Sequence, residues 1–425
     1  MVQVRPSSHF GASEYLSSRF MKMWPSITAS LAAMVILQHP AAASSNASVV
    51  SIPAQYTYLL PGNFTGDPIY SFANGTSTTE PSVNNLLADA AQAPFISFDD
   101  EFLDLLGPNP TPHLIEQRSS NFAGEAGVWI KERGEVWYTT WINDGPTHIE
   151  ILNLTDNSIR RPNISEPIEN PNGGFYHQGL VYFTSLRVMT DISSSGGVVS
   201  VDPETGHVAQ VLNSYMGLKF DSIDDVAWVT QPGTNKSYMY ITILPFTILG
   251  DRPLPVDRLP QGIWRFDPQE EVLLPVISRT DLPVANGVRP SPDQKHLYVT
   301  DFGGDGHAAA WGLPAQVGSP SVYKYDLDDE MYPVNRRVIA SARMQAPDGV
   351  RVDNKGRLWT GEGEGVVVRN RHGKVIGIFN AQYFTRDAVN VAIVQFALAG
   401  DDLIILGQDK LWRVKLTEMV VTVSS

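Results

Sequence analysis

The sequence predicts an all-β fold, a six-bladed β-propeller preceded by an N-terminal extension. A short strand of aromatic and β-branched residues recurs six times, at spacings of 45 to 61 residues. Each copy follows another short strand and a turn, and each is followed by a third strand. Strands bounded by turn residues and repeated at this period are typical of propeller blades, so six repeats indicate six blades. The recurring strand occupies Val136–Thr139, Val181–Thr184, Tyr238–Thr242, Leu297–Thr300, Leu358–Thr360 and Leu403–Leu406.

Composition and charge restrict the partners. The 425 residues include 31 basic and 45 acidic side chains, no cysteine, and a formal net charge of −14. A nucleic-acid partner is not expected, because neutralising phosphates requires a basic face. The sequence has no run of 18 apolar residues, so we expect no membrane span. Without disulfides, the fold depends on its apolar core and on what it binds.

The first residues predict export. Lys22 precedes an apolar run over 27–37, and Ala41-Ala42-Ala43 supplies a small-residue cleavage pattern. We therefore expect residues 1–43 to be a secretory signal that is removed, with Met21 as an alternative start. The other interpretation is a membrane anchor or a buried helix, but eleven apolar residues are too few to span a bilayer. Six predicted glycosylation sites agree with a secreted protein. They are Asn46, Asn63, Asn74, Asn153, Asn163 and Asn235.

Residues 44–118 form the predicted extension, which packs on the ring or closes it. Residues 44–94 are rich in Ser, Asn, Pro and Ala and are interpreted as loosely packed or as an exposed linker. A helix is expected over 95–107, where Phe102, Leu105 and Leu106 have helical spacing and acidic residues lie in the first turn. The propeller itself is expected over 119–425. Two segments could close its ring beside the last blade, namely 113–117 and 420–423.

The first strand of every predicted blade begins with a polar residue. First strands are innermost in a propeller, so these residues are expected to converge at one end of the central channel. Three carboxylates in a small volume repel one another and are costly to desolvate, so they must take up protons or a cation. The converging residues are Glu125, Asn172, Asp224, Asn286, Asp348 and Asn390.

Every donor atom in this set is oxygen, which favours a hard ion. Calcium accepts six to eight loosely arranged oxygens, including those of Asn side chains, so Ca²⁺ is expected, with another divalent cation as an alternative. The competing interpretation is that Asn-Gly and Asp-Gly here are ordinary turn dipeptides.

The loops that join second and third strands are expected to surround this ion and to contact a substrate. Within them, His307 lies in a glycine-rich stretch and is the candidate acid–base auxiliary. Asn172 and Asp225, at the channel end, are further candidate substrate ligands. The loop candidates are Trp141, Arg187, Phe246, Arg252, Phe302, His307, Trp311 and Glu362.

At these residues the chain resembles the gluconolactonase/regucalcin-like family, and within it the secreted fungal lactonohydrolases. The resemblance covers roughly 95–415, and the Asn-Gly and Pro-Asp-Gly elements with their following strands carry it. The matching pieces are Glu125–Trp129, Asn170–Gly174, Phe220–Val226, Ala285–Val288, Ser291–Asp293, Leu297–Asp301, Ala346–Val350, Gly356–Trp359 and Phe98–Phe102.

The resemblance implies a six-bladed propeller that holds a catalytic divalent ion, usually calcium, and hydrolyses lactones. By this resemblance Glu125, Asn286 and Asp348 match the family's metal ligands, and Asp348 also matches its general base. Asp224 stands where the family usually has Asn, and Asp221 likewise replaces an Asn. The extra negative charge implies tighter ion binding and weaker polarisation of a substrate carbonyl.

The expected function is metal-assisted hydrolysis of a small-molecule lactone or related ester. The ion would polarise the carbonyl, and Asp348 or Asp225 would take a proton from the attacking water. Three alternatives remain: a phosphotriesterase or arylesterase using the same site, a calcium-stabilised propeller that binds without chemistry, and a metal-free propeller acting on a natural product.

Overall fold

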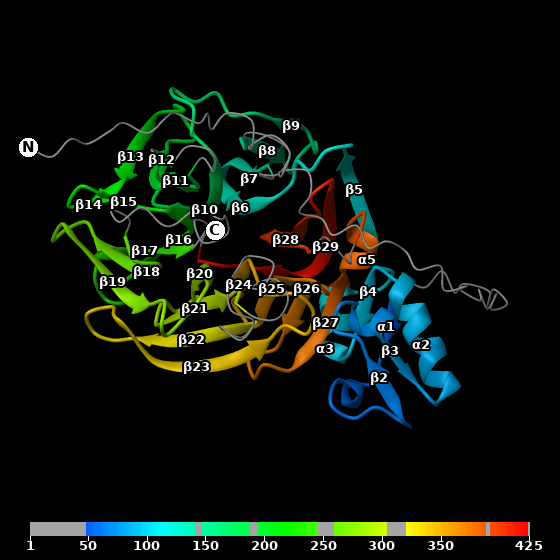
Figure 1. Cartoon of the computed structure of the whole chain (residues 1–425). Coiled ribbons are helices and arrows are strands. Elements are labelled where there is room, and N and C mark those ends of the chain that lie inside the picture. Colours follow the sequence, from blue (N-terminus) through cyan, green and yellow to red (C-terminus); the bar gives the residue numbers. More distant parts are fainter. Residues whose placement is uncertain are drawn as a thin grey trace, which may run out of the picture. The chain divides into compact units, whose positions relative to one another are not determined.

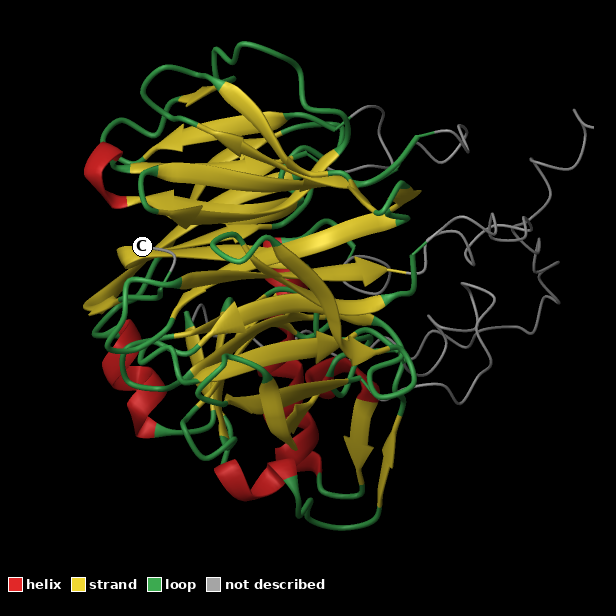
Figure 2. Ribbon diagram, turned by 90° about the vertical axis from the view of Figure 1, so that its left-hand side faces the viewer, coloured by secondary structure: helices red, strands yellow, loops and turns green. Residues whose placement is uncertain are grey.

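The computed structural model describes residues 48–140, 147–187, 194–244, 259–303, 320–387 and 392–423. In the unit that spans Ser45–Ser425, six sheets surround a common axis (Figure 1). The predicted all-β, six-bladed propeller is therefore confirmed. Figure 2 shows strands as the predominant element, with only short helices between them. Among the described residues, every helix is too short or too polar to cross a bilayer.

Blades one to four each contain four antiparallel strands that follow one another in chain order, from the axis outward. Blade one consists of β6 (Glu125–Ile130), β7 (Glu135–Thr139), β8 (Ile149–Asn153) and β9 (Ile159–Arg160). Blade two consists of β10 (Pro171–His177), β11 (Leu180–Ser185), β12 (Gly197–Val201) and β13 (Val208–Leu212). Blade three consists of β16 (Ser222–Thr230), β17 (Ser237–Leu244), β18 (Gly262–Asp267) and β19 (Val272–Ser278). Blade four consists of β20 (Ala285–Pro290), β21 (His296–Asp301), β22 (Ser321–Leu327) and β23 (Pro333–Ser341).

Blades five and six recruit strands from the N-terminal region. Blade five consists of β24 (Val350–Val352), β25 (Leu358–Glu362), β26 (Gly365–Arg369) and β27 (Val375–Asn380), extended by β4 (Phe95–Ser97) and β1 (Val49–Ser51). Blade six consists of β28 (Gln395–Leu406), β29 (Lys410–Val420) and β5 (Pro112–Gln117). Two small hairpins, β2 (Phe64–Gly66) with β3 (Thr76–Thr78) and β14 (Ser214–Tyr215) with β15 (Leu218–Lys219), stand apart from the blades.

The segment that closes the ring is β5. It pairs antiparallel with β29, with Trp412 opposite Leu114 and Val414 opposite Pro112. Of the two candidates from the sequence, the structure therefore places the N-terminal one at the outer edge of blade six. The C-terminal candidate lies at and beyond the end of β29, where Val420 pairs with Gly400.

Inner strands are buried on both faces because each blade packs between two neighbours. All eight residues of β17 are buried, and so are eight of the nine in β16. Their apolar side chains belong to one cluster that spans blades two to four, with Phe175, Trp228 and Tyr240 among its members. This packing explains why the repeated strands are apolar at successive positions rather than alternating.

Much of the N-terminal region is packed on blade five, whereas residues 57–70 are mostly exposed, as expected for a loosely packed segment. Helix α2 (Pro81–Gln92) buries Val83 and Leu87 in a cluster with Val367 and Ile378 of blade five. The side chain of Asn380 donates hydrogen bonds to three carbonyls at the end of α2, the shortest 2.9 Å from Nδ2 to the oxygen of Ala93. These contacts satisfy helix-end carbonyls that would otherwise lack partners.

Short helices complete the region. The helix expected over 95–107 is shorter, α3 (Asp100–Leu106), because Phe95–Ser97 pair as strand β4 with β27 and β1. Phe102, Leu105 and Leu106, which have helical spacing in the sequence, are all buried. Its N-cap, Asp99, accepts a 3.0 Å hydrogen bond from the Glu101 amide. The other helices in the described ranges are α1 (Phe72–Gly75) and the 3-10 turn η1 (Ala54–Thr57) in this region, and α5 (Ala381–Phe384) and the 3-10 turn η2 (Lys131–Arg133) in the propeller.

Candidate active site

The first strands of blades one to four share one irregularity at the axis. In each of them the pairing with the second strand shifts register close to the predicted polar residue, which is the geometry of a β-bulge. A bulge bends a strand and re-aims its side chains, so it frees these residues from the ordinary alternation of the sheet. The shifts lie between Glu125 and Val128, Pro171 and Gly174, Ile223 and Val226, and Ala285 and Val288.

The glycine that follows the polar residue in blades two, four and five is required by close contact between blades. A Cβ atom on Gly173 would lie 2.4 Å from the carbonyl oxygen of Asp224, and one on Gly287 would lie 2.5 Å from that of Asp348. Gly349 faces a side-chain oxygen of Gln395 at 2.2 Å in the same way. None of the three has positive φ. These Asn-Gly and Asp-Gly pairs are therefore places where neighbouring backbones meet, not left-handed turns.

A threonine at the end of the second strand fixes the polar residue of the next blade. Its buried hydroxyl donates to the backbone carbonyl of that residue, so each hydrogen bond crosses from one blade to its neighbour. The repeated strand ends in Thr for this reason in three blades. The three bonds are Thr139 to Asn172, Thr184 to Asp224 and Thr300 to Asp348, at 3.0, 2.7 and 2.8 Å.

The structure brings four predicted residues together, and we call Glu125, Asp224, Asn286 and Asp348 the axial cluster. Burial and the charges of Asp348, Asp224 and Asp225 raise the pKa of Glu125 well above its usual range. The pKa of Asp224 is raised by burial and by Asp348 and Asp225. Burial and Asp225 raise the pKa of Asp348 to about 8, although a hydrogen bond from Asn286 acts in the opposite direction. The carboxylates thus repel one another across the blades.

Amides are the only side-chain partners of these carboxylates in the described part of the chain. Asn172 Nδ2 donates to Asp224 Oδ1 at 3.0 Å, and Gln395 Nε2 lies 3.5 Å from Glu125 Oε2. The side-chain oxygen of Asn286 is buried and has no hydrogen-bond partner among the described residues. Arg289 and Arg351 act on Asp224 and Glu125 through their charges, but no ion pair with the cluster occurs among the described residues. Carboxylates without an ion-pair contact, beside an unused amide oxygen, favour binding of a cation.

Asp225 lies next to the cluster but is fully engaged. Its Oδ2 accepts hydrogen bonds from Arg289 Nη1 at 2.5 Å and from the Val288 amide at 3.0 Å. Its Oδ1 accepts from the Val226 amide at 2.9 Å. Arg289 also donates to the carbonyl of Gly174 at 2.9 Å, so this ion pair ties blades two, three and four together.

A second buried arginine, Arg351, was missed by the sequence analysis, as was Arg289. Arg351 Nη2 donates to the carbonyl of Ala126 at 2.7 Å, across the ring. Burial and the charge of Arg289 hold its pKa well below the usual range. A sequence signal was present, because Asn286-Gly287-Val288-Arg289 and Asp348-Gly349-Val350-Arg351 repeat one pattern in adjacent blades.

The match to a family model agrees with this geometry. Residues 123–392 match the model described as SMP-30/Gluconolactonase/LRE-like region. The chain belongs to the SMP-30/gluconolactonase/LRE-like family. The matched residues include every member of the axial cluster and most of the propeller.

Relatives and solved structures are similar to this chain over about two thirds to four fifths of its length. Lactonohydrolase oryH of Aspergillus oryzae is 23% identical over 406 residues, covering 80% of this chain and 84% of the relative. A gluconolactonase of Zymomonas mobilis is 23% identical over 301 residues, covering 66% of this chain and 74% of the relative. The solved gluconolactonase of Xanthomonas campestris has a TM-score of 0.55 at 19% identity and covers 75% and 94% of the two chains. The structural likeness supports the six-bladed fold.

The other predicted site residues do not form one group: some are buried in the fold, and some lie outside the described residues. Arg187 is buried in an ion pair with Asp221, with Nε 3.1 Å from Oδ1. Phe302 is partly buried, and its amide donates to the carbonyl of Val284. Five loop candidates lie outside the described residues, namely Trp141, Phe246, Arg252, His307 and Trp311.

Blade six differs from the expectation at its polar residue. Asn390 lies outside the described residues, and β28 begins at Gln395, which contacts Glu125 as described above. Gln395 therefore stands where blade six meets the axial cluster. Its role could not be predicted from the sequence, because Gln395 is followed by Phe396 instead of the Gly seen in three other blades.

The described residues contain no group of three or more His, Cys, Asp or Glu side chains that could hold a metal ion. The three axial carboxylates therefore do not form such a group by themselves. A cation at the axis would need a further donor, and the amide oxygen of Asn286 is the one fully buried side-chain oxygen of the cluster without a partner among the described residues. If the Asn286 oxygen takes part, the residues present fit a hard divalent ion, because all the donor atoms are oxygens.

Four of the five described glycosylation candidates are accessible. Asn63, Asn74, Asn163 and Asn235 are exposed, and Asn153 is partly buried. Asn46 lies outside the described residues.

Proposed function

We propose that this protein is a lactone hydrolase whose active site is the axial cluster. The observation that carries the proposal is the set of mutually repelling carboxylates that form no ion pair in the described part, beside the unpartnered oxygen of Asn286. The names of the family relatives, lactonohydrolase and gluconolactonase, supply the substrate class.

The proposed centre binds a divalent cation, with Ca²⁺ as the expected ion. Glu125, Asp224, Asn286 and Asp348 would hold it. When bound, the cation would offset the cluster's negative charge and supply Lewis-acid polarisation of the lactone carbonyl.

The chain's own residues have distinct tasks in the proposed reaction. Asp348 accepts a proton from the water that attacks the carbonyl carbon, and the ring C–O bond then breaks. The proton ends on the released alkoxide, so the product is a hydroxy acid. Asp225 is not assigned this task, because both of its oxygens already accept hydrogen bonds. Asn172 orients Asp224 through its 3.0 Å hydrogen bond.

Hydrolysis of δ-gluconolactone and longer aldonolactones by the purified chain tests the proposal, followed as acid release at constant pH. We expect the parent chain to hydrolyse the lactone faster than the spontaneous rate. Glu125→Gln should lose this turnover, and added Ca²⁺ should not restore even half of the parent rate. The matched control is Glu132→Gln, the same change at the exposed far end of the same blade. Turnover by Glu125→Gln at the parent rate would refute the assignment of the site. If the chain hydrolyses phenyl acetate or a phosphotriester but no lactone, the substrate is an aryl ester or a phosphotriester instead of a lactone.

We also propose that the protein is exported and glycosylated. The accessible sequons support this proposal. A decrease in mass after enzymatic deglycosylation of the secreted protein tests it, and an unchanged mass would contradict it.

A further inference from the structure

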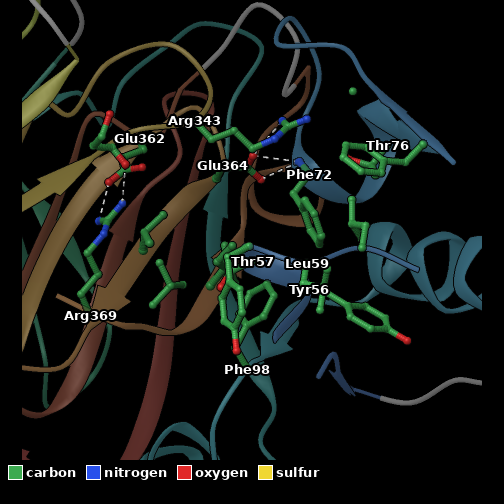
Figure 3. A pocket seen from close by; sticks show the side chains of 18 residues that line it. Tyr56, Thr57, Leu59, Phe72, Thr76, Phe98, Arg343, Glu362, Glu364 and Arg369 are labelled. Carbon is green, nitrogen blue, oxygen red and sulfur yellow. Dashed lines mark hydrogen bonds and ion pairs between the residues drawn. The ribbon is translucent and has the colours of Figure 1, made fainter. Parts of the chain in front are cut away.

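A cavity of about 460 Å³ lies between the N-terminal region and blade five, apart from the axial cluster. One wall comes from residues 56–76 and Phe98, and the opposite wall from β25, β26 and β27 (Figure 3). Its volume lies within the range of small-molecule pockets, roughly 300–1,000 Å³. None of the four axial residues lines it.

Most of this cavity is apolar. Phe98, Val367 and Ile378 form a buried floor. Leu59 and Phe64 stand at the mouth and are 62% and 59% exposed. Large apolar side chains left in water around an apolar cavity are a common feature of ligand sites, because a ligand removes that surface from water.

Two ion pairs are set into the walls, and they leave the cavity without net charge. Arg369 Nη1 lies 2.6 Å from Glu362 Oε1, and Arg343 Nη1 lies 3.2 Å from Glu364 Oε1 (Figure 3). The Phe72 amide also donates to Glu364, at 2.8 Å. Both guanidinium groups therefore already have a carboxylate partner. A charged ligand would enter an apolar space without a free counter-charge, which is costly.

One carboxylate in the wall has an oxygen with spare acceptor capacity, that of Glu362, which lines the cavity and is 1% exposed. Oε1 of Glu362 accepts hydrogen bonds from Thr360 Oγ1 at 2.5 Å and from Arg369 at 2.6 Å. Among the described residues, no donor is directed to the other oxygen, Oε2. A ligand that donates one hydrogen bond to Oε2 would satisfy the carboxylate without adding charge.

We propose that this cavity is a second binding site, which takes an uncharged, mainly apolar small molecule with one hydrogen-bond donor, such as a hydroxyl or aryl amine. The apolar body fills the space between Phe98 and Leu59, and the donor bonds to Glu362. The site does not depend on the hydrolase proposal, because it shares no residue with the axial cluster.

Two dyes with the same ring system test the site by fluorescence titration of the full chain. N-phenyl-1-naphthylamine is uncharged with one N–H, whereas 8-anilinonaphthalene-1-sulfonate adds a negative charge to the same rings. We expect one saturable site for the uncharged dye and at least about tenfold weaker binding of the sulfonate. The N-methylated form of the uncharged dye lacks the donor and is expected to bind several-fold more weakly.

Matched double variants locate the site. Leu59→Ala with Phe64→Ala removes apolar surface from the mouth, and we expect at least about tenfold weaker dye binding. The control is Ile69→Ala with Met216→Ala, two side chains that are 62% and 87% exposed but do not line the cavity. Its affinity should equal that of the parent chain.

Three results would overturn the proposal. The first is absence of saturable binding of the uncharged dye, and the second is sulfonate binding of equal strength. The third is equal weakening in both double variants, which would indicate general adsorption to exposed apolar surface. Equal affinity of the N-methylated dye would overturn the role of Glu362.

Discussion

Buried carboxylates in this protein have two kinds of surroundings. Away from the axis, Asp353 accepts hydrogen bonds from Arg357 Nε at 2.7 Å and from Trp359 Nε1 at 3.0 Å. Glu362 has a similar arginine partner. In the axial cluster, neither Glu125 nor Asp348 forms an ion pair among the described residues. The charge of Asp348 raises the pKa of Glu125, and that of Asp225 raises the pKa of Asp348. Arg351 interacts with Glu125 through its charge alone.

The difference separates stability from function. A paired buried carboxylate holds strands together, and removing one partner leaves the other charge uncompensated. Unpaired carboxylates destabilise the fold until a cation or a proton neutralises them. The same residue types therefore hold the blades together near Asp353 and form a candidate reaction centre near Asp348.

The sharpest test exchanges one residue of the cluster for its amide. Asp348→Asn is expected to lower kcat/KM for lactones by at least about 10³-fold, because it removes both the proton acceptor and a cation donor. The variant should unfold no more easily than the parent in metal-free urea titrations, since it relieves repulsion with Glu125. Reduced stability of Asp348→Asn with full lactonase activity would show that Asp348 has a structural role and not a catalytic one.

The same exchange at the paired site should have the opposite effect. Asp353→Asn is expected to lower the free energy of unfolding by about 3 kcal/mol, because the buried ion pair with Arg357 is lost. Arg357 keeps Glu418, 2.6 Å from its Nη2, as a counter-charge, so the loss lies at the lower end of the range for broken buried pairs. Urea unfolding measures this loss, and lactone turnover per folded molecule should stay at the parent value. A loss below about 1 kcal/mol would show that the pair is not structural.

Glu364 is an intermediate case. It forms an ion pair with Arg343, but burial still disfavours its charged form. Burial and Glu362 raise its pKa to about 7, against lowering effects of Arg343 and the Phe72 amide. The folded state then binds more protons than the unfolded chain between about pH 4.5 and 7, so stability falls by roughly 3 kcal/mol as pH rises through that window. Glu364→Gln should flatten this part of the stability curve. An unchanged slope would mean that Glu364 is ionised throughout.

Calcium should remove the strain of the cluster. At free Ca²⁺ about 100 times Kd, the parent chain is expected to gain roughly 2.7 kcal/mol of stability over the chelated protein. Asp353→Asn should show the same gain, whereas Glu125→Gln should show little. Thermal unfolding midpoints with Ca²⁺, Mg²⁺ and chelator measure this. Equal midpoints in all three would contradict a cation site at the axis.

The smallest effect is expected at the threonines that position the cluster. Thr184→Val removes the 2.7 Å hydrogen bond to the carbonyl of Asp224 and should cost about 1–2 kcal/mol. Turnover should also fall several-fold, because Asp224 loses a positioning contact. The control is Thr230→Val, at the end of β16 that lies away from Asp224, where the hydroxyl contacts Ser237. This variant should lower stability without changing turnover.

The repeat made most of the fold predictable, because every blade contains the same strand pattern. Prediction failed where one residue acts differently in context. The amino-acid pattern of residues 44–94 did not indicate packing, since it is the partners Val367 and Asn380 that bury α2. Gln395 was missed because its blade lacks the Asn-Gly or Asp-Gly pair.

The residues of the axial cluster could be predicted from their common position in the repeat. The hydrogen-bond and ion-pair partners of each residue could not. Asp224 and Asp225 are adjacent in sequence, yet one accepts from an amide and the other from Arg289. The bulge in β16 sends the two side chains to different partners, and the position of that bulge depends on the neighbouring blades.

The pairing of β5 with β29 has a consequence for how this protein is made. The outer strand of blade six is synthesised before the first strand of blade one, but its partner emerges only after the other five blades. Until then β5 has an unpaired edge, and the ring cannot close. Such long-range pairing slows folding, so completion of the propeller follows release of nearly the whole chain from the ribosome.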